Sequence, residues 1–188
     1  MNLRERKKLE AWRAIRAAAL KLFAERGYDA VSVEQIAAAA NVSRATYFNY
    51  FAGKEAVVFD QDPQERDNLR AMMDARPAGE PLWDSLTAIM IGLNERLADR
   101  MPLQRRLKAQ SPALAQSTQD FGEQFRADLH EWARRRAGDS VTTTLQLNLA
   151  SAAAATAYQT WGPDEPFEDY LRRLRECLRQ VGAGVAGL

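Results

Sequence analysis

Cysteine and histidine are scarce in this chain of 188 residues, where Cys177 and His130 are the only residues of their types. A single cysteine cannot form an internal disulfide, and the two residues together offer too few ligands for a tetrahedral zinc site. The apolar helical pattern around Cys177 favours a packed position, and the charged neighbours of His130 favour a solvated one. We therefore expect no disulfide framework, no metal and no cofactor.

Long apolar runs and secretion signals are also missing. No stretch approaches the roughly 20 apolar residues of a membrane-spanning helix, and the basic residues 1–8 are not followed by an apolar signal segment. The chain shows no convincing nucleophile–base pair, phosphate-binding loop or carboxylate cluster. These absences predict a cytoplasmic protein without a membrane segment, and they argue against an enzyme.

Charge is unevenly distributed, although the whole chain carries only +1. Residues 1–54 hold 10 Lys and Arg against 5 Asp and Glu, a local charge of +5, and the remainder carries −4. A positive end on a negative body favours a polyanionic partner at the N-terminal end. Charge alone does not identify that partner as DNA.

Helical periodicity runs along the chain, and strand-like alternation is absent. An apolar content of 46% suits a soluble globular protein with a buried core. The segment 54–75 is expected to be a kinked or split connecting helix, because Asp62 and Pro63 interrupt its pattern. The predicted helices span residues 5–26, 32–40, 43–51, 54–75, 82–97, 102–109, 113–136, 141–161 and 167–181.

Residues 32–51 have the pattern of two short helices joined by a tight turn. Ser32 can cap the first helix, with Gln35 three residues later as its partner in a capping box. Asn41 tolerates the left-handed conformation that ends this helix, and Ser43 can cap the next one. The segment therefore predicts a helix-turn-helix.

The second of these helices has a buried side and an outer side. At about 100° per residue, Tyr47 and Phe51 share one side and are expected to pack in the core. The other side has neither an apolar stripe nor an acidic residue, which suits a helix that enters a major groove. It comprises Arg44, Ala45, Thr46, Phe48, Asn49 and Tyr50.

This outer side predicts specific contacts with DNA. Arginine suits the O6 and N7 acceptors of guanine, asparagine suits the adenine edge, and alanine permits close approach to a thymine methyl. The predicted base contacts are Arg44, Ala45 and Asn49. The predicted contacts with the DNA backbone are Ser32, Thr46, Tyr50 and Lys54.

The basic start of the first helix is expected to cross the DNA backbone with Arg4, Arg6, Lys7 and Lys8. The alternative is three packed helices with an ordinary polar surface and a solvated basic tail. The caps, the tight turn, the aromatic-backed helix and the local charge occur together, and this combination favours DNA binding.

Residues 12–58 resemble the DNA-binding domain of the TetR family of bacterial transcriptional regulators. The resemblance rests on Ser-Val-Glu-Gln-Ile-Ala at 32–37, Val-Ser-Arg-Ala-Thr-Tyr-Phe-Asn-Tyr-Phe at 42–51 and Gly-Lys-Glu-Ala at 53–56. It implies the same base and backbone contacts, position by position. Two residues depart from the family pattern: Phe48 replaces a tyrosine that commonly reaches a phosphate, and Asn41 replaces a glycine.

The resemblance also implies an architecture and a mode of action. It implies an all-α homodimer of about nine helices, with a three-helix DNA-binding domain over 1–53 and a helical effector-binding and dimerisation domain over 54–188. We expect a repressor on a palindromic operator, released by a small, largely apolar effector. A DNA-binding regulator without a small-molecule ligand is the alternative, and an enzyme or protein-interaction module on a helical scaffold is a third reading.

Large apolar side chains on the C-terminal helices are the candidates for an effector pocket, because Met-rich, aromatic linings suit adaptable apolar sites. The candidates are Met72, Met73, Trp83, Leu86, Met90, Leu93, Phe121, Phe125 and Trp132. A filled core is the alternative for each of them. The basic run Arg105, Arg106 and Lys108 faintly resembles regulators that take acyl-CoA-like ligands, whose phosphates would meet such residues; a solvated charge run is the alternative.

The last two predicted helices are the candidates for a dimer contact, because Ala150 and the alanines at 152–155 permit close approach. Packing within one subunit is the alternative. Two reading helices must lie about 34 Å apart to enter successive major grooves. We expect an effector to favour another spacing, with the segment 54–75 transmitting the change.

Overall fold

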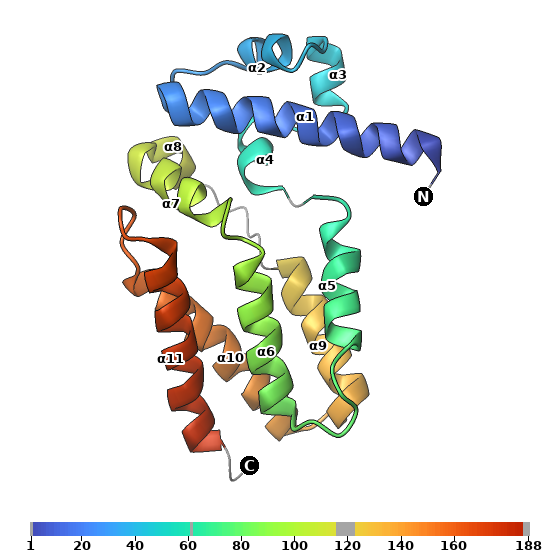
Figure 1. The fold of residues 1–188 in the computed structure, drawn as a ribbon, viewed down its shortest axis with the longest axis vertical. Coiled ribbons are helices and arrows are strands. Elements are labelled where there is room, and N and C mark those ends of the chain that lie inside the picture. The colour runs from blue at the N-terminus through green and yellow to red at the C-terminus, as the bar shows by residue number, and fades with distance from the viewer. Residues whose placement is uncertain (1, 61, 116–122, 186–188) are drawn as a thin grey trace. The chain divides into compact units, whose positions relative to one another are not determined.

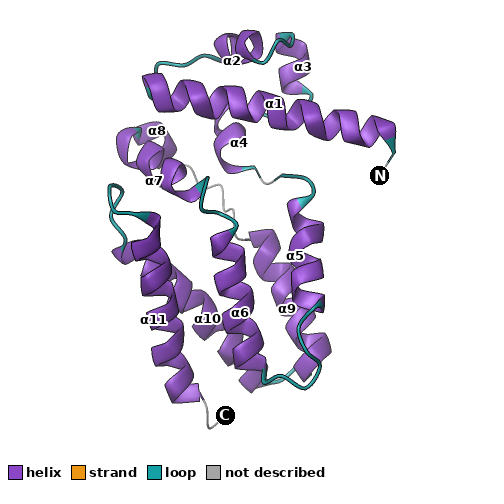
Figure 2. Ribbon diagram, viewed as in Figure 1, coloured by secondary structure: helices purple, strands orange, loops and turns teal. Residues whose placement is uncertain are grey.

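The computed structural model describes residues 2–60, 62–115 and 123–185, and their regular structure is entirely helical (Figure 2). The all-α prediction is confirmed, but the prediction of about nine helices is wrong. In this described part, no helix is long and apolar enough to cross a membrane. The eleven described helices are α1 (Leu3–Arg26), α2 (Val33–Ala39), α3 (Arg44–Phe48), α4 (Lys54–Phe59), α5 (Glu65–Asp74), α6 (Leu82–Glu95), α7 (Met101–Gln110), α8 (Pro112–Ala115), α9 (Glu123–Ala137), α10 (Val141–Thr160) and α11 (Phe167–Val185).

The additional helices arise where one expected helix is represented by two. The segment 54–75 is split into α4 and α5. Asp60 is already extended, with ψ 139°, and Pro63 disfavours helical backbone at the preceding residue and has no N–H to donate. The segment 113–136 contains α8 and α9. Phe121, a predicted pocket residue, lies outside the described residues.

Contacts divide the chain into two compact units. Unit 1 comprises Met1–Pro63 with Leu103–Phe121, and unit 2 comprises Gln64–Pro102 with Gly122–Leu188. A segment that is distant in sequence therefore joins the first 63 residues. The functional division into domains 1–53 and 54–188 stays a prediction.

The core of unit 1 forms where α1 packs on α2 and α4. Trp12 of α1 lies against Phe51, with ring centroids 5.3 Å apart, and Tyr47 is fully buried. Leu107 of α7 and Leu114 of α8 are also fully buried in this cluster. Residues 103–114 are therefore part of the core that supports the helix-turn-helix.

Unit 2 contains α5, α6, α9, α10 and α11 around one apolar core. Within it, α10 and α11 run side by side (Figure 1). Trp83 of α6 lies directly against Gly182 of α11, where a Cβ atom would come within 2.4 Å of the indole Nε1. Deeper in the core, Tyr170 donates a hydrogen bond to Asn94 at 2.6 Å, so neither polar group is buried without a partner.

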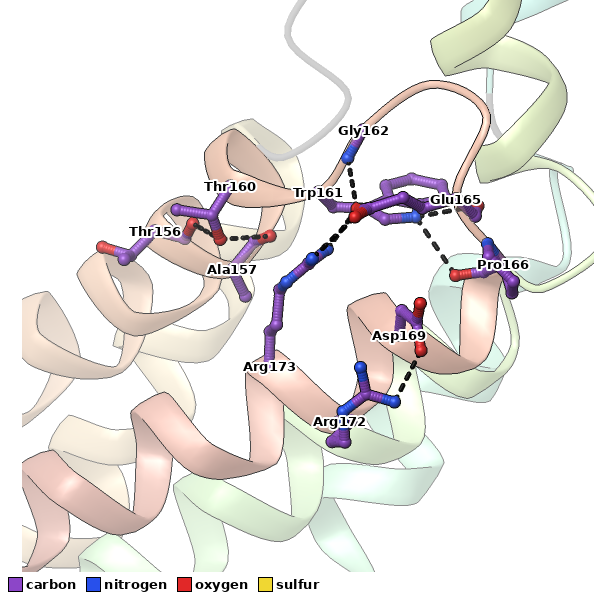
Figure 3. A network of polar contacts seen from close by, with 10 residues as sticks. All are labelled: Thr156, Ala157, Thr160, Trp161, Gly162, Glu165, Pro166, Asp169, Arg172 and Arg173. Carbon is purple, nitrogen blue, oxygen red and sulfur yellow. Dashed lines mark hydrogen bonds and ion pairs between the residues drawn. The ribbon is translucent and has the colours of Figure 1, made fainter.

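The loop between α10 and α11 is held by the carboxylate of Glu165 (Figure 3). This carboxylate accepts hydrogen bonds from the guanidinium of Arg173 at 2.5 and 2.9 Å and from the N–H of Gly162 at 2.7 Å. The Arg173 bonds, followed by the Gly162 bond, lower the pKa of Glu165 to about 2. The buried Trp161 donates its indole N–H to the carbonyls of Glu165 and Pro166. The loop is therefore held both by Arg173 of α11 and by Trp161 at the end of α10.

Candidate DNA-binding interface

The helix-turn-helix of unit 1 is built as its sequence predicts. Ser32 and Gln35 form a reciprocal capping box, with N···O distances of 3.2 and 2.9 Å. Asn41 has φ 54°, the left-handed conformation expected at the turn. Ser43 caps α3 by accepting a hydrogen bond from the N–H of Thr46 at 3.0 Å. Local side-chain bonds therefore fix where both helices begin.

The two sides of α3 differ as expected. Tyr47 and Phe51 are buried, and the Tyr47 hydroxyl donates to the carbonyl of Gly53 at 3.1 Å, which anchors the end of α3 to the start of α4. On the other side, Arg44, Ala45 and Asn49 are exposed. Regular helix ends at Phe48, but Asn49 keeps helical dihedrals as the C-cap, so the predicted base contacts still share one surface.

Arg44 contacts two neighbouring side chains. Its Nε lies 3.1 Å from Oε1 of Glu34 on α2, and its guanidinium lies 5.5 Å from the ring centroid of Phe48. Both partners of the ion pair are largely exposed, so water screens it and DNA can replace Glu34. The sequence pattern of α3 contained no signal for Glu34, because this acid comes from the neighbouring helix.

The predicted backbone contacts occupy different environments. Ser32 is exposed, its Oγ accepts the capping bond from the N–H of Gln35, and its side chain also forms a hydrogen bond with the carboxylate of Glu34. The Thr46 hydroxyl lies 2.8 Å from that of Ser43. Tyr50 is half-buried and packs on the unit 1 core. Contacts of these three side chains with the DNA backbone stay predictions.

Lys54 has a structural role that the sequence did not reveal. Its ammonium donates to the carbonyls of Tyr28 and Val31 at 2.8 and 2.9 Å, and it lies 4.0 Å above the Tyr28 ring centroid. Partial burial lowers the pKa of Lys54, although Asp29 and Glu55 act against that shift. Two of the three ammonium protons are thus committed to the loop before α2, and a phosphate contact stays a prediction for the third.

The start of α1 presents an exposed basic surface. Arg4, Arg6, Lys7 and Lys8 are all exposed, and Arg6 has only a long, exposed ion pair with Glu10 at 3.6 Å. Asn2 and Glu5 form a capping box that starts the helix close to these residues. The positive charge expected from the sequence is therefore accessible to a polyanion.

The described pocket candidates come together in the core of unit 2. Six are buried, and Met72 and Trp83 pack against the same cluster as partly buried residues. This arrangement fits a filled core as well as an effector site. A pocket of about 410 Å³ between α5 and α9 touches two candidates, Met73 and Trp132. Its polar lining has no residue in common with the predicted pocket and consists of Arg70, Asp74, Asp128, Glu131 and Arg135.

The basic run at 105–108 is not part of that pocket. It lies in the segment that belongs to unit 1. There the Lys108 ammonium lies 4.7 Å from the ring centroid of Phe59, and Leu107 is buried in the unit 1 core. A contact of this run with an acyl-CoA-like ligand stays a prediction.

Comparisons with known proteins agree with this architecture. The chain is 28% identical over 173 residues to the protein proposed to be the mycofactocin biosynthesis transcriptional regulator MftR of Mycobacterium tuberculosis, covering 89% of this chain and 87% of that protein. The fold of this chain is similar to that of the fatty acid degradation regulator FadR of Bacillus halodurans, with a TM-score of 0.59 and 19% identity. The match covers 95% of this chain and 96% of that protein. FadR of Thermus thermophilus, solved with lauroyl-CoA, gives a TM-score of 0.54, 23% identity and coverage of 90% and 92%.

A capped helix-turn-helix with a buried aromatic side and an exposed polar side places this chain among the helix-turn-helix DNA-binding proteins. Residues 15–60 match the model of the family described as bacterial regulatory proteins, tetR family. The resemblance noted in the sequence is thereby confirmed for this segment, and the chain contains a helix-turn-helix domain similar to that of the TetR-family regulators.

Proposed function

We propose that the protein is a ligand-responsive repressor that binds a palindromic operator as a homodimer. The exposed surface of α3 carries this proposal, because Arg44, Ala45 and Asn49 are open to solvent while Tyr47 anchors the opposite side. Arg44 reads guanine, Asn49 reads adenine, and Ala45 lets the helix approach the base edges. The phosphate contacts come from Ser32, Thr46, Tyr50 and Lys54.

The double substitution Arg44→Ala with Asn49→Ala tests this surface. Both side chains are exposed, so the variant should keep the Tm of the wild type. It should lose sequence preference in selection from a random duplex library and retain only weak binding, which falls steeply between about 50 and 200 mM salt. Arg96→Ala, at an exposed position of unit 2, is the control. A wild-type preference in the double variant would show that α3 does not read the bases.

The proposed dimer contact is the outer surface of α10. None of the residues in Val141–Thr160 is charged, and Val141 and Leu145 are 86% and 41% exposed. A pocket of about 510 Å³ along the first turns is lined by these two residues and their neighbours. The outer surface of α11 instead carries Arg172, Arg175 and Arg179. An uncharged helix surface suits a two-fold contact with a second copy of the same chain.

The proposed effector is a small, largely apolar molecule with a polar end. In the pocket between α5 and α9, Met73 and Trp132 belong to the apolar core, whereas Arg70 and Arg135 are exposed. An acyl-CoA-like compound is one candidate, although its phosphates would meet the carboxylates of Asp74, Asp128 and Glu131 in the same pocket as the two arginines. The lauroyl-CoA in the Thermus thermophilus FadR structure supports the same chemical class.

We propose that an effector acts on the DNA-binding part through the ion pairs between α5 and α9 at this pocket. Arg66 and Arg70 of α5 bind the carboxylate of Asp128 on α9 at 2.8 and 2.9 Å. A ligand between the two helices would displace α5, which lies in the connecting segment 54–75. The proposed result is a dimer with a different spacing of its reading helices.

Thermal-shift measurements with lauroyl-CoA, laurate and coenzyme A separate the two candidate functions. A specific ligand raises Tm by mass action, and an effector should also release the protein from its selected operator. If a footprint on that operator stays unchanged across these probes and a wider metabolite library, the alternative of a DNA-binding regulator without a small-molecule ligand is favoured.

A further inference from the structure

Phe48 is the only aromatic residue among the large apolar side chains exposed in the described part of the chain, with 45% of its surface accessible. The ring is nevertheless held in place. It meets the Tyr47 ring edge-on, with centroids 5.4 Å apart and an interplanar angle of 85°, and the Arg44 guanidinium lies over it at 5.5 Å. An aromatic side chain with contacts to Tyr47 and Arg44 is thus presented to solvent from the helix that carries the proposed base readers.

The chemistry of this ring limits what it can contact on DNA. Phenylalanine has no hydroxyl to donate to a phosphate oxygen. In the major groove the apolar group at the base edge is the C5-methyl of thymine, which phenylalanine can contact. Covering the ring and the methyl together removes apolar surface from water, which is favourable.

The position of the ring predicts where that thymine lies. Arg44 is the first residue of α3 and Phe48 is four residues later, which corresponds to about 6 Å along a helix. Base pairs are about 3.4 Å apart. We propose that Phe48 reads the C5-methyl group of a thymine one or two base pairs from the guanine contacted by Arg44, and that Phe48 is therefore a residue that determines operator specificity.

The contact with Arg44 links the two readings. The guanidinium of Arg44 contacts both Glu34 and the Phe48 ring. When guanine replaces Glu34, the ring still borders the guanidinium, so thymine and guanine are read by one ordered pair of side chains. This inference rests on the proposed placement of α3 in the groove.

Deoxyuridine provides the direct test, because it differs from thymidine only by the C5-methyl group. The operator is first selected with the full-length protein from a random duplex library. Thymidine near the selected guanine is then replaced by deoxyuridine. Wild-type affinity should fall about fourfold for each half-site, the effect of losing one buried methyl-sized group. Deoxyuridine at thymine positions farther from the guanine is the control and should have no effect.

The variant Phe48→Ala should bind the two duplexes equally and should lose the preference for thymine. A wild-type protein that is insensitive to deoxyuridine, or a Phe48→Ala variant that keeps the full penalty, would overturn the inference, the second by assigning the methyl to Ala45. Arg44→Ala with Asn49→Ala keeps the two proposals apart: if it abolishes sequence preference while deoxyuridine has no effect, α3 reads DNA but Phe48 does not.

Photocrosslinking tests the contact without relying on a variant that folds. In 5-iododeoxyuridine the iodine takes the place of the thymine methyl, and irradiation couples the base to an adjacent side chain. Mass spectrometry of the wild-type complex should locate the crosslink at Phe48. A crosslink at Ala45 or at a residue outside α3 would contradict the assignment.

Discussion

The environment of Lys54 combines a structural role with a proposed DNA contact. Lys54→Met keeps the apolar stem but leaves the carbonyls of Tyr28 and Val31 without their charged donor, so the free energy of unfolding should fall by about 1–2 kcal/mol in urea titrations. If the third ammonium proton binds a phosphate, the slope of log K against log salt should also fall by about 0.9 per subunit. Lys21→Met, at an exposed position of α1, should leave stability unchanged; equal losses in both variants would contradict the role of Lys54.

Asn41 is a residue whose conformation was predictable from the sequence. Its φ of 54° places it in the left-handed region, which asparagine and glycine tolerate and most residues do not. We expect Asn41→Ala to lower the free energy of unfolding by about 1 kcal/mol because of this backbone cost. Asn41→Gly should stay close to the wild type. Chemical denaturation measures both, and an alanine variant as stable as wild type would show that the turn relaxes.

The ends of helices were predictable where they depend on residues close in sequence, whereas contacts between residues far apart in sequence were not. The caps of α2 and α3 depend on residues three positions apart, so Ser32 and Gln35 were sufficient to predict the start of α2. The partners of Lys54 are 26 and 23 residues away, and Glu34 reaches Arg44 across a turn. Side chains that join different elements leave no periodic signal, and for this reason these contacts were missed.

The loop between α10 and α11 makes a prediction about pH. The pKa of Glu165 is lowered to about 2 in the folded protein from an ordinary value of 4.5. Its stabilising contribution is therefore fully present above pH 4.5 and is lost as the pH falls toward 2. Glu165→Gln should lower Tm at pH 6, and the difference from wild type should shrink at pH 3. Glu168→Gln, exposed on α11, is the control; a difference independent of pH would mean that the Arg173 and Gly162 bonds do not require the charge.

At the scale of the whole molecule, sequence order does not coincide with compact structure. Leu107 and Leu114 complete the core of unit 1, although most of the chain around them belongs to unit 2. Ser111 donates a hydrogen bond to Asp29 at 2.8 Å, in the loop before α2 whose carbonyls bind Lys54. Helical periodicity identifies such residues as buried without saying which core receives them. The candidate reading surface was predictable because one short segment contains it, whereas the pocket between α5 and α9 required the fold.

The distribution of charge on the last two helices makes the proposed dimer testable. Glutamates at Val141 and Leu145 would place two like charges from each subunit against each other in the proposed contact, where they cannot be solvated. The variant Val141→Glu with Leu145→Glu should sediment as a monomer while keeping the helical circular dichroism of the wild type. Its affinity for the full palindrome should fall by about 10²- to 10⁴-fold, because the second half-site no longer binds within the same complex.

The control for this variant is Ala71→Glu with Ala75→Glu, which adds the same charges at the same spacing to exposed positions of α5 and its C-cap. This control variant should remain a dimer. If both variants dimerise, the contact lies elsewhere; if both dissociate, added charge acts without regard to its place, and the uncharged surface of α10 has no special role.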